Sequence, residues 1–160
     1  MTRLTHLDKS GNAHMVDVSD KDKTSRMAKA SATINLTKTA MTALIEGNLQ
    51  KGDALGVARI AGIIAAKKTA DLIPLCHPLP ITKVSVNLVT DTNSNTVVAT
   101  ATVKTKGQTG VEMEALTAAS VAALTLYDML KSIDKSITIS TIQLIEKRGG
   151  KSGTWERTIE

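Results

Sequence analysis

Apolar and polar residues alternate along four stretches of the chain, which predicts four β-strands. In the first stretch, Arg26 lies on the same side of the predicted strand as the alanines. We therefore expect a cation at the edge of a covered surface. The second and third stretches flank DTNSN, a turn-forming segment, and predict a hairpin. In the fourth stretch, the alternation of apolar and polar residues shifts by one position between Ile139 and Ile142. A β-bulge near Ser140 would produce this shift. The four stretches are residues 26–36, 82–89, 95–104 and 136–147.

Two segments between the first two strands carry helix signals. Residues 37–47 begin with Thr37 as a cap and end with Gly47. Residues 53–68 consist of alanine, glycine and aliphatic residues, with Arg59 as the only internal charge. Such small side chains predict close contact with a neighbouring helix.

A third helix is predicted over residues 110–133, and it carries no charge from Ala115 to Tyr127. The surface helix of a monomer usually has a polar stripe along one side. We therefore expect both sides of this helix to be covered, one by the sheet and the other by a second subunit.

The order strand, two helices, two strands, helix, strand predicts an α+β fold of the ferredoxin-like kind, an antiparallel sheet with helices on one face. We expect a single domain over residues 1–160, with residues 1–25 as an N-terminal arm and residues 148–160 as a tail. The doubly covered helix adds the expectation of a homo-oligomer.

Composition narrows the class of protein. One cysteine permits no internal disulfide, the N-terminus lacks a signal-peptide pattern, and no apolar run approaches roughly 20 residues. We therefore expect a soluble, cytoplasmic protein without membrane contact. The net charge of +5 favours anionic partners, whereas one Trp, one Tyr and no Phe leave little for nucleic-acid bases to stack on. A small phosphorylated ligand fits this composition better than a nucleic acid.

The ionisable residues of the long helix lie near its two ends. Glu112 and Glu114 are in its first turn, where a carboxylate also stabilises the helix dipole, so capping is the alternative role. Asp128 and Lys131 are three residues apart and can form an ion pair, which on a surface would be unremarkable. The uncharged middle favours a buried position, where each terminal charge needs a partner.

Glu114 and Asp128 cannot easily belong to one compact pocket of a single chain. Fourteen residues of straight helix correspond to about 21 Å at 1.5 Å per residue. A site that uses both residues needs either a long ligand or a second, antiparallel copy of the helix.

Lys51, which precedes Gly52 and Asp53, allows two interpretations. It is a loop lysine before an Asp helix cap, or it is a general base whose pKa is lowered by a neighbouring cation such as Lys131.

The loop DLIPLCHPLP holds the chain's only cysteine, Cys76, beside His77 and between its three prolines. Zinc needs about four ligands, and His6 and His14 have no matching spacing, so we expect no metal site. Neighbouring residues of an extended loop tend to face opposite sides, which disfavours a Cys-His catalytic pair. We expect a packing role for Cys76 and a rigid pocket wall that displays His77.

The segment GGKSG, residues 149–153, is not a Walker A motif. Ile145 stands where that motif needs glycine, and we expect no helix after Ser152. Either the tail contributes amides and Lys147 or Lys151 to phosphate binding, or it is a flexible terminus.

Long segments of the chain resemble the cyclic pyranopterin monophosphate synthase family, the molybdenum cofactor biosynthesis protein C group. Gln108 departs from the pattern, since a lysine is expected before TGVEMEA. The matching segments are LTHLDKSGNAHMVDVSDK, KGDALGVARIAGIIAAKKTADLIPLCHPL, TGVEMEALTAASVAALTLYDMLK and GGKSG.

The resemblance implies a lyase of molybdenum cofactor biosynthesis. Members of the family convert 3′,8-cyclo-7,8-dihydroguanosine 5′-triphosphate into cyclic pyranopterin monophosphate and release pyrophosphate. They are hexamers built as trimers of dimers, with the active site expected at a subunit interface. No cofactor is firmly implied, and Mg²⁺ with the triphosphate is left open. The alternative is a ferredoxin-like ligand-binding or regulatory module without catalysis.

The resemblance also assigns catalytic roles to matching positions. Lys51 and Lys131 are the implied acid/base pair, with Asp128 as the active-site carboxylate that orients Lys131. His77 is the implied proton shuttle.

The implied substrate contacts come from three parts of the chain. Arg26 and Lys147 would hold the triphosphate, because guanidinium geometry suits bidentate phosphate contact. Glu112 or Glu114 would accept hydrogen bonds from guanine-type N–H groups. The matching substrate-binding segments are Leu75, Cys76 and His77, and Met113 and Glu114.

Overall fold

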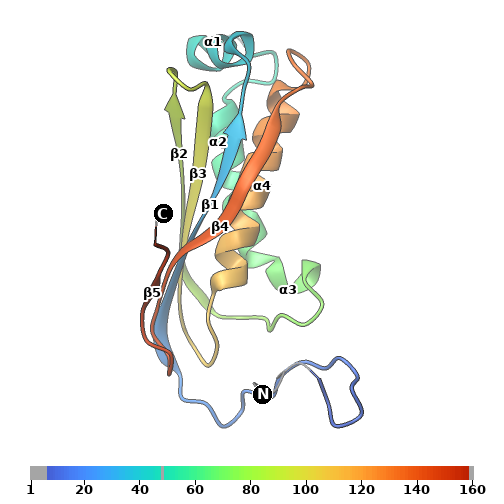
Figure 1. Cartoon of the computed structure of the whole chain (residues 1–160), viewed down its shortest axis with the longest axis vertical. Coiled ribbons are helices and arrows are strands. Elements are labelled where there is room, and N and C mark those ends of the chain that lie inside the picture. Colours follow the sequence, from blue (N-terminus) through green and yellow to red (C-terminus); the bar gives the residue numbers. More distant parts are fainter. Residues whose placement is uncertain (1–6, 48, 159–160) are drawn as a thin grey trace.

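The computed structural model describes residues 7–47 and 49–158. Its five strands form one antiparallel sheet in the order β2-β3-β1-β4-β5, with two long helices against it (Figure 1). The strands are β1 (Thr24–Asn35), β2 (Ile81–Asp91), β3 (Thr96–Gly107), β4 (Thr138–Arg148) and β5 (Trp155–Glu156). The helices are α1 (Lys38–Glu46), α2 (Ala54–Lys67), α3 (Thr69–Leu72) and α4 (Glu112–Leu130).

The connections confirm the predicted α+β arrangement. The helices α1, α2 and α3 connect β1 to β2, and β3 lies between those two strands and is antiparallel to both. This is a split β-α-β unit. Helix α4 packs on β1, β3 and β4, and α2 packs beside α4 and on β2, so the long helices cover one face of the sheet.

Local signals in the sequence correctly located both ends of α1 and the start of α2, whereas α4 begins two residues later and ends three residues earlier than predicted. The Thr37 side chain accepts a hydrogen bond from the backbone N–H of Ala40, and Gly47 ends α1 at φ 69°. The Asp53 side chain likewise caps α2 by accepting from the N–H of Gly56 at 2.9 Å. Each cap satisfies a backbone group that has no partner within its helix.

The predicted hairpin and bulge are also confirmed. Strands β2 and β3 pair across the turn before Thr96. In the β1–β4 pair the register shifts between Ser140 and Gln143, and Thr141 has φ 51°. A second shift follows between Leu144 and Glu146, which the sequence did not predict. The short elements α3 and β5 were not predicted either.

Small residues bring α2 and α4 close together, as predicted. A Cβ placed on Gly62 would lie 2.8 Å from the carbonyl oxygen of Ala118 and 3.2 Å from the Cβ of Ala122. The two helix backbones are therefore too near for a larger side chain at this position.

Helix α4 is long and apolar enough to cross a membrane by length and composition, although the sequence alone suggested no such run. Half of it is buried inside the fold, and core helices of soluble proteins meet the same criterion. We therefore describe α4 as a core helix.

The sheet and α2 do not cover α4 completely. Leu124 of α4 and three residues of α2 are large apolar side chains that are 43% to 59% exposed. We call these the outer apolar residues; those of α2 are Val57, Ile60 and Ile64. Helix α2 therefore supplies part of the second cover of α4 that was expected from another subunit, and the outer apolar residues remain exposed in the single chain.

Candidate active site

A pocket of about 280 Å³ lies where the first turn of α4 meets the loop before β2. We call it the His77 pocket. Cys76 and His77 both line it, so the expectation that these neighbours face opposite sides is wrong. The loop is not fully extended there, because a turn places the N–H of Cys76 3.0 Å from the carbonyl oxygen of Ile73. The predicted site residues that line the pocket are Leu75, Cys76, His77, Glu112, Met113 and Glu114.

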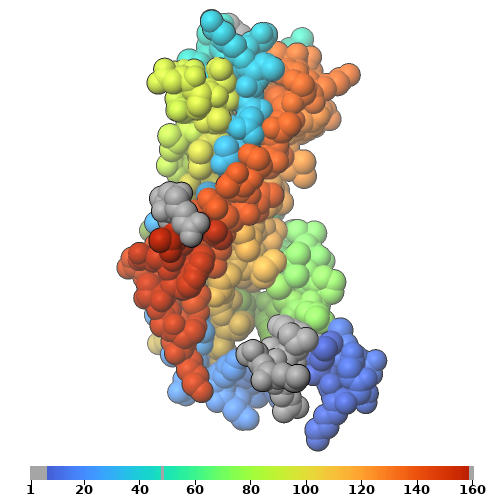
Figure 2. Space-filling model, viewed as in Figure 1, coloured from blue at the N-terminus to red at the C-terminus, as the bar shows by residue number. Residues whose placement is uncertain are grey.

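The N-terminal arm forms part of this pocket, although the sequence did not predict such a role for it. Val16, Val18 and Lys21 line it, and the arm lies beside the loop that carries His77 at the lower end of the molecule (Figures 1 and 2). The alternating valines of MVDVSDK were the available signal. Gln108 also binds the arm, since its Nε2 donates to the carbonyl oxygen of Ser19 at 3.2 Å.

The arm determines which ring nitrogen of His77 carries a hydrogen. Its Nε2 lies 2.8 Å from the carbonyl oxygen of Val16. A carbonyl oxygen can only accept, so Nε2 carries a hydrogen and donates it. In the neutral ring, Nδ1 is then the nitrogen that can take up a proton.

Burial changes the acidity of two groups in the pocket. Glu114 is only 4% exposed, and burial raises its pKa to about 6, with a further upward contribution from the charge of Glu112. Burial, and then the charge of Glu114, raises the pKa of the Cys76 thiol. Cys76 is therefore held as a thiol, which suits a packing role better than a nucleophilic one.

A second pocket, of about 690 Å³, adjoins the first and shares Lys21 and Thr109 with it. We call it the Arg26 pocket. Lys151 and Ser152 of the tail also line it. Because β5 pairs with β4 just beyond these residues, the described part of the tail is not a free terminus.

Lys147 lies between the two pockets. Its Nζ donates a hydrogen bond to Ser152 Oγ, and it lies 4.0 Å from Glu112 Oε1. Ser152 lines the Arg26 pocket and Glu112 lines the His77 pocket. An elongated ligand with an anionic end could therefore occupy both pockets and contact Lys147 in the middle.

The other predicted catalytic residues form a separate cluster. Lys51 Nζ lies 2.9 Å from Asp128 Oδ2, and Lys131 Nζ lies 2.7 Å from Asp128 Oδ1. Gly52, at φ 83°, turns the chain just before α2 and leaves Lys51 beside the end of α4. All three charged side chains are about half exposed.

The ion pairs define the charges of this cluster. Hydrogen bonds from Lys131 and then from Lys51 lower the pKa of Asp128 to about 2. The same carboxylate raises the pKa of Lys131, so it favours the ammonium form of this lysine. Lys51 and Lys131 are neighbours as predicted, but the carboxylate between them keeps Lys131 protonated.

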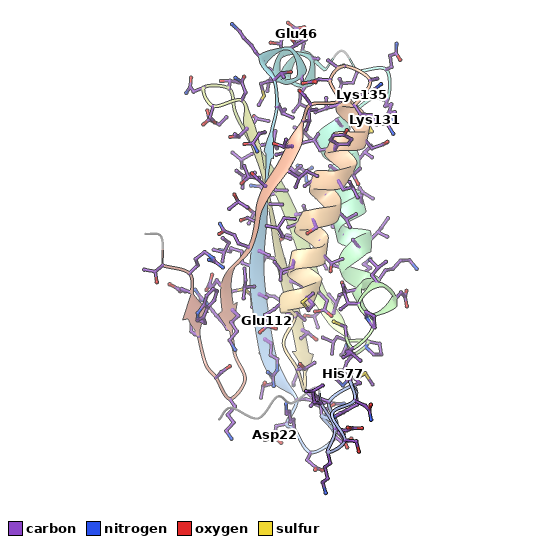
Figure 3. The ribbon with its side chains drawn as sticks, turned by 45° about the vertical axis from the view of Figure 1, so that its right-hand side comes forward. Asp22, Glu46, His77, Glu112, Lys131 and Lys135 are labelled. Carbon is purple, nitrogen blue, oxygen red and sulfur yellow. The ribbon has the colours of Figure 1, made fainter. Side chains whose placement is uncertain are left out.

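One chain does not bring the cluster to the pockets. Lys131 lies at one end of α4, and Glu112 and His77 lie at the other (Figure 3). The intervening helix of 19 residues spans about 28 Å. The separation predicted from the sequence between Glu114 and Asp128 is thus present in the folded chain.

Over residues 7–47 and 49–158, no three His, Cys, Asp or Glu side chains gather in a way that could hold a metal ion, and His6 lies outside these ranges.

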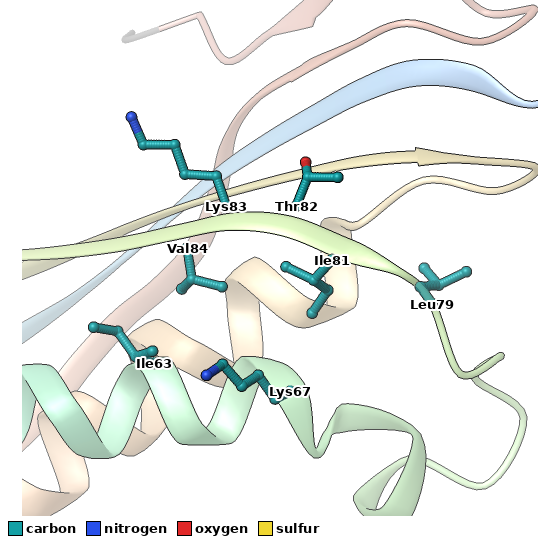
Figure 4. Close-up of a pocket in the computed structure, with 7 residues that line it drawn as sticks. All are labelled: Ile63, Lys67, Leu79, Ile81, Thr82, Lys83 and Val84. Carbon is teal, nitrogen blue, oxygen red and sulfur yellow. The ribbon is translucent and has the colours of Figure 1, made fainter.

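A further pocket of about 470 Å³ lies between α2 and β2 (Figure 4). Its ionisable residues are Lys67 and Lys83, so it lacks the carboxylates and histidine of the His77 pocket.

Comparison with known proteins agrees with the motifs. The model of the MoaC family matches residues 15–150. A cyclic pyranopterin monophosphate synthase of Cereibacter sphaeroides is 58% identical over 98% of both chains. Proteins of the same name are 60% identical in Jannaschia sp. (strain CCS1), over 98% of this chain and 96% of theirs, and 56% identical in Thermomicrobium roseum, over 98% and 95%. The resemblance seen in the sequence is therefore confirmed, and the chain belongs to the MoaC family.

Proposed function

We propose that this chain acts as a cyclic pyranopterin monophosphate synthase in molybdenum cofactor biosynthesis. It is a lyase that converts 3′,8-cyclo-7,8-dihydroguanosine 5′-triphosphate into cyclic pyranopterin monophosphate and releases pyrophosphate. The observation that carries the proposal is the pair of adjoining pockets in a chain whose relatives bear that name. One pocket holds two carboxylates and His77, and the other holds three cations, Lys21, Arg26 and Lys151, together with the carboxylates of Asp20 and Asp22.

The pockets divide the substrate between them. In the His77 pocket, Glu112 and Glu114 accept hydrogen bonds from the N–H groups of the purine-derived rings, and Leu75 and Met113 contact the ring faces. Arg26 and Lys147 bind the triphosphate, with Mg²⁺ as an optional companion of the phosphates. His77 moves protons through Nδ1, because Nε2 is bonded to Val16.

Lys131 and Lys51 supply the acid/base chemistry. The ion pair with Asp128 fixes the position of Lys131, so Asp128 is the carboxylate that orients this member of the acid/base pair. Asp128 also orients Lys51, which donates to both its carboxylate and its backbone carbonyl oxygen.

The complete site forms between two copies of the chain. A second, antiparallel copy of α4 brings its Lys51, Asp128 and Lys131 to the pockets of the first. The outer apolar residues of α2 and α4 support this, because they offer a surface for the second copy to cover. The resulting assembly is a hexamer built from three such dimers, in the cytoplasm and without nucleic acid or membrane as a partner.

A direct assay tests the proposal. Purified protein is incubated with the cyclised nucleotide, and released pyrophosphate and the fluorescent pterin formed after oxidation are measured. Lys51→Ala and Lys131→Ala should still bind the nucleotide, while turnover falls by about 10²-fold or more. Lys135→Ala, an exposed lysine of the same region, is the matched control and should retain turnover. A wild-type protein that binds the nucleotide without converting it would instead support the ligand-binding module.

A further inference from the structure

Arg26 is held along one edge of its guanidinium group. Its Nε donates to the carbonyl oxygen of Gly107 at 3.0 Å, and its Nη2 donates to that of Gln108 at 3.1 Å. Within residues 7–47 and 49–158, no residue forms a hydrogen bond with Nη1 of Arg26. Because Arg26 lines the Arg26 pocket, its Nη1 hydrogens remain for a ligand there.

The tail crosses Arg26 at two glycines. A Cβ on Gly149 would lie 2.2 Å from the carbonyl oxygen of Ser25, so the tail backbone directly contacts β1. A Cβ on Gly150 would lie 2.2 Å from Nη1 of Arg26 and 2.9 Å from its Cζ. Any side chain at position 150 would therefore need the space that the guanidinium occupies.

We propose that Gly150 is a positioning residue for anion binding, because its lack of a side chain allows Arg26 to present Nη1 to the phosphates while Gly107 and Gln108 hold the opposite edge. This rests on the proposed function for the identity of the anion, and it adds which edge of Arg26 binds. The Nε–Nη2 edge is already occupied, so the expected bidentate phosphate contact must use Nη1 and the second hydrogen of Nη2.

A methyl group at position 150 should push the guanidinium away from the two carbonyl oxygens. The guanidinium cannot retreat while Nε and Nη2 keep their hydrogen bonds, so Arg26 loses the orientation that faces the pocket. Since a hydrogen bond to a charged group is lost, we expect Gly150→Ala to raise KM for the cyclised nucleotide by about tenfold or more. The kcat should change much less, because Arg26 contacts phosphates and not the acid/base groups.

Gly153→Ala is the matched control. Gly153 lies in the same loop and also has positive φ, 64° against 75° for Gly150, so both alanines carry similar backbone strain. A Cβ on Gly153 has no atom within 4 Å. KM should therefore stay within about twofold in Gly153→Ala. Equal rises in KM in the two variants would overturn the proposal, as would no rise in either.

A double-mutant cycle separates contact with Arg26 from a role in the tail backbone. Arg26→Lys removes Nη1, so Gly150→Ala should add little to its effect on KM. If Gly150→Ala raises KM equally in the wild-type and the Arg26→Lys proteins, its effect comes from the backbone of the tail and not from contact with Arg26. That result would overturn the proposal. If Gly150→Ala fails to fold, folding of the Arg26→Lys/Gly150→Ala protein would support the clash with Arg26, and failure of both would contradict it.

Inorganic tripolyphosphate distinguishes this proposal from the proposed function. Its Kd, measured by calorimetry, should rise in Gly150→Ala and not in Gly153→Ala, whether or not the wild-type protein turns over the nucleotide. If the wild-type protein turns over the nucleotide but the two variants have equal Kd values for tripolyphosphate, the proposed function stands and the role of Gly150 is excluded. A wild-type protein that binds no tripolyphosphate would also overturn the assignment.

Discussion

Glu114 is a buried carboxyl group whose protonation affects stability. Its pKa of about 6 in the folded chain lies above the ordinary value of 4.5, because burial disfavours the charged form. Protonated Glu114 therefore stabilises the fold fully below about pH 4.5, and this contribution is lost as the pH rises through 6. The shift corresponds to roughly 2 kcal/mol at neutral pH.

Glu114→Gln should remove this penalty, because glutamine is neutral and nearly the same shape. In urea unfolding at fixed protein concentration, the variant should exceed the wild type by about 2 kcal/mol at pH 7.5 and match it near pH 4. Glu156→Gln, on an exposed carboxylate of β5, is the control and should change stability by less than about 0.5 kcal/mol at either pH. Parallel pH profiles of wild type and Glu114→Gln would show that Glu114 does not titrate in this range.

At the residue scale, the sequence predicted side chains better than backbone groups. The motifs identified His77 and Glu114, and both line the pocket. The hydrogen bond from His77 to the carbonyl oxygen of Val16 and the close approach of Gly150 to Arg26 could not be predicted, because neither Val16 nor Gly150 contributes a side chain with its own chemistry. Both became visible only when distant parts of the chain were placed together.

At the element scale, α2 and α4 are held close by Gly62. Helix propensity alone predicts that Gly62→Ala stabilises the protein by about 1 kcal/mol. The added methyl group would instead press on the backbone oxygen of Ala118, which cannot move without the helix. We expect a net loss of about 1–3 kcal/mol in urea unfolding. A stabilised variant would mean that the two helices can separate at little cost.

Element boundaries could be predicted wherever a local signal exists. Thr37 and Gly47 define α1 because a cap and a left-handed glycine are encoded by single residues. The phase slip near Ser140 similarly located the bulge. Helix α3 and strand β5 have four and two residues, too few to display a period. The arm was assigned outside the core because its contacts are non-local.

At the scale of the whole molecule, the candidate site is divided. The pockets lie at the start of α4 and the Lys51–Asp128–Lys131 cluster at its end. The sequence predicted this division from helix length, but a single chain carries no information about the arrangement of a second one. Mixing two variants tests whether residues of two copies of the chain form one active site.

His77→Ala and Lys131→Ala should each lower turnover by about 10²-fold or more, and mixed oligomers of the two should regain activity. In a mixed dimer, one of the two sites contains both substitutions. The other site combines an intact His77 pocket from one chain with an intact Lys51–Asp128–Lys131 cluster from the other. Random pairing makes half of the dimers mixed, so turnover should return to about a quarter of the wild-type value. Adding Ile60→Asp to both chains should abolish the recovery by disrupting the outer apolar residues, whereas Ile45→Asp, on exposed Ile45 of α1, should not. If mixed oligomers form without recovering turnover, each chain must contain its own complete site.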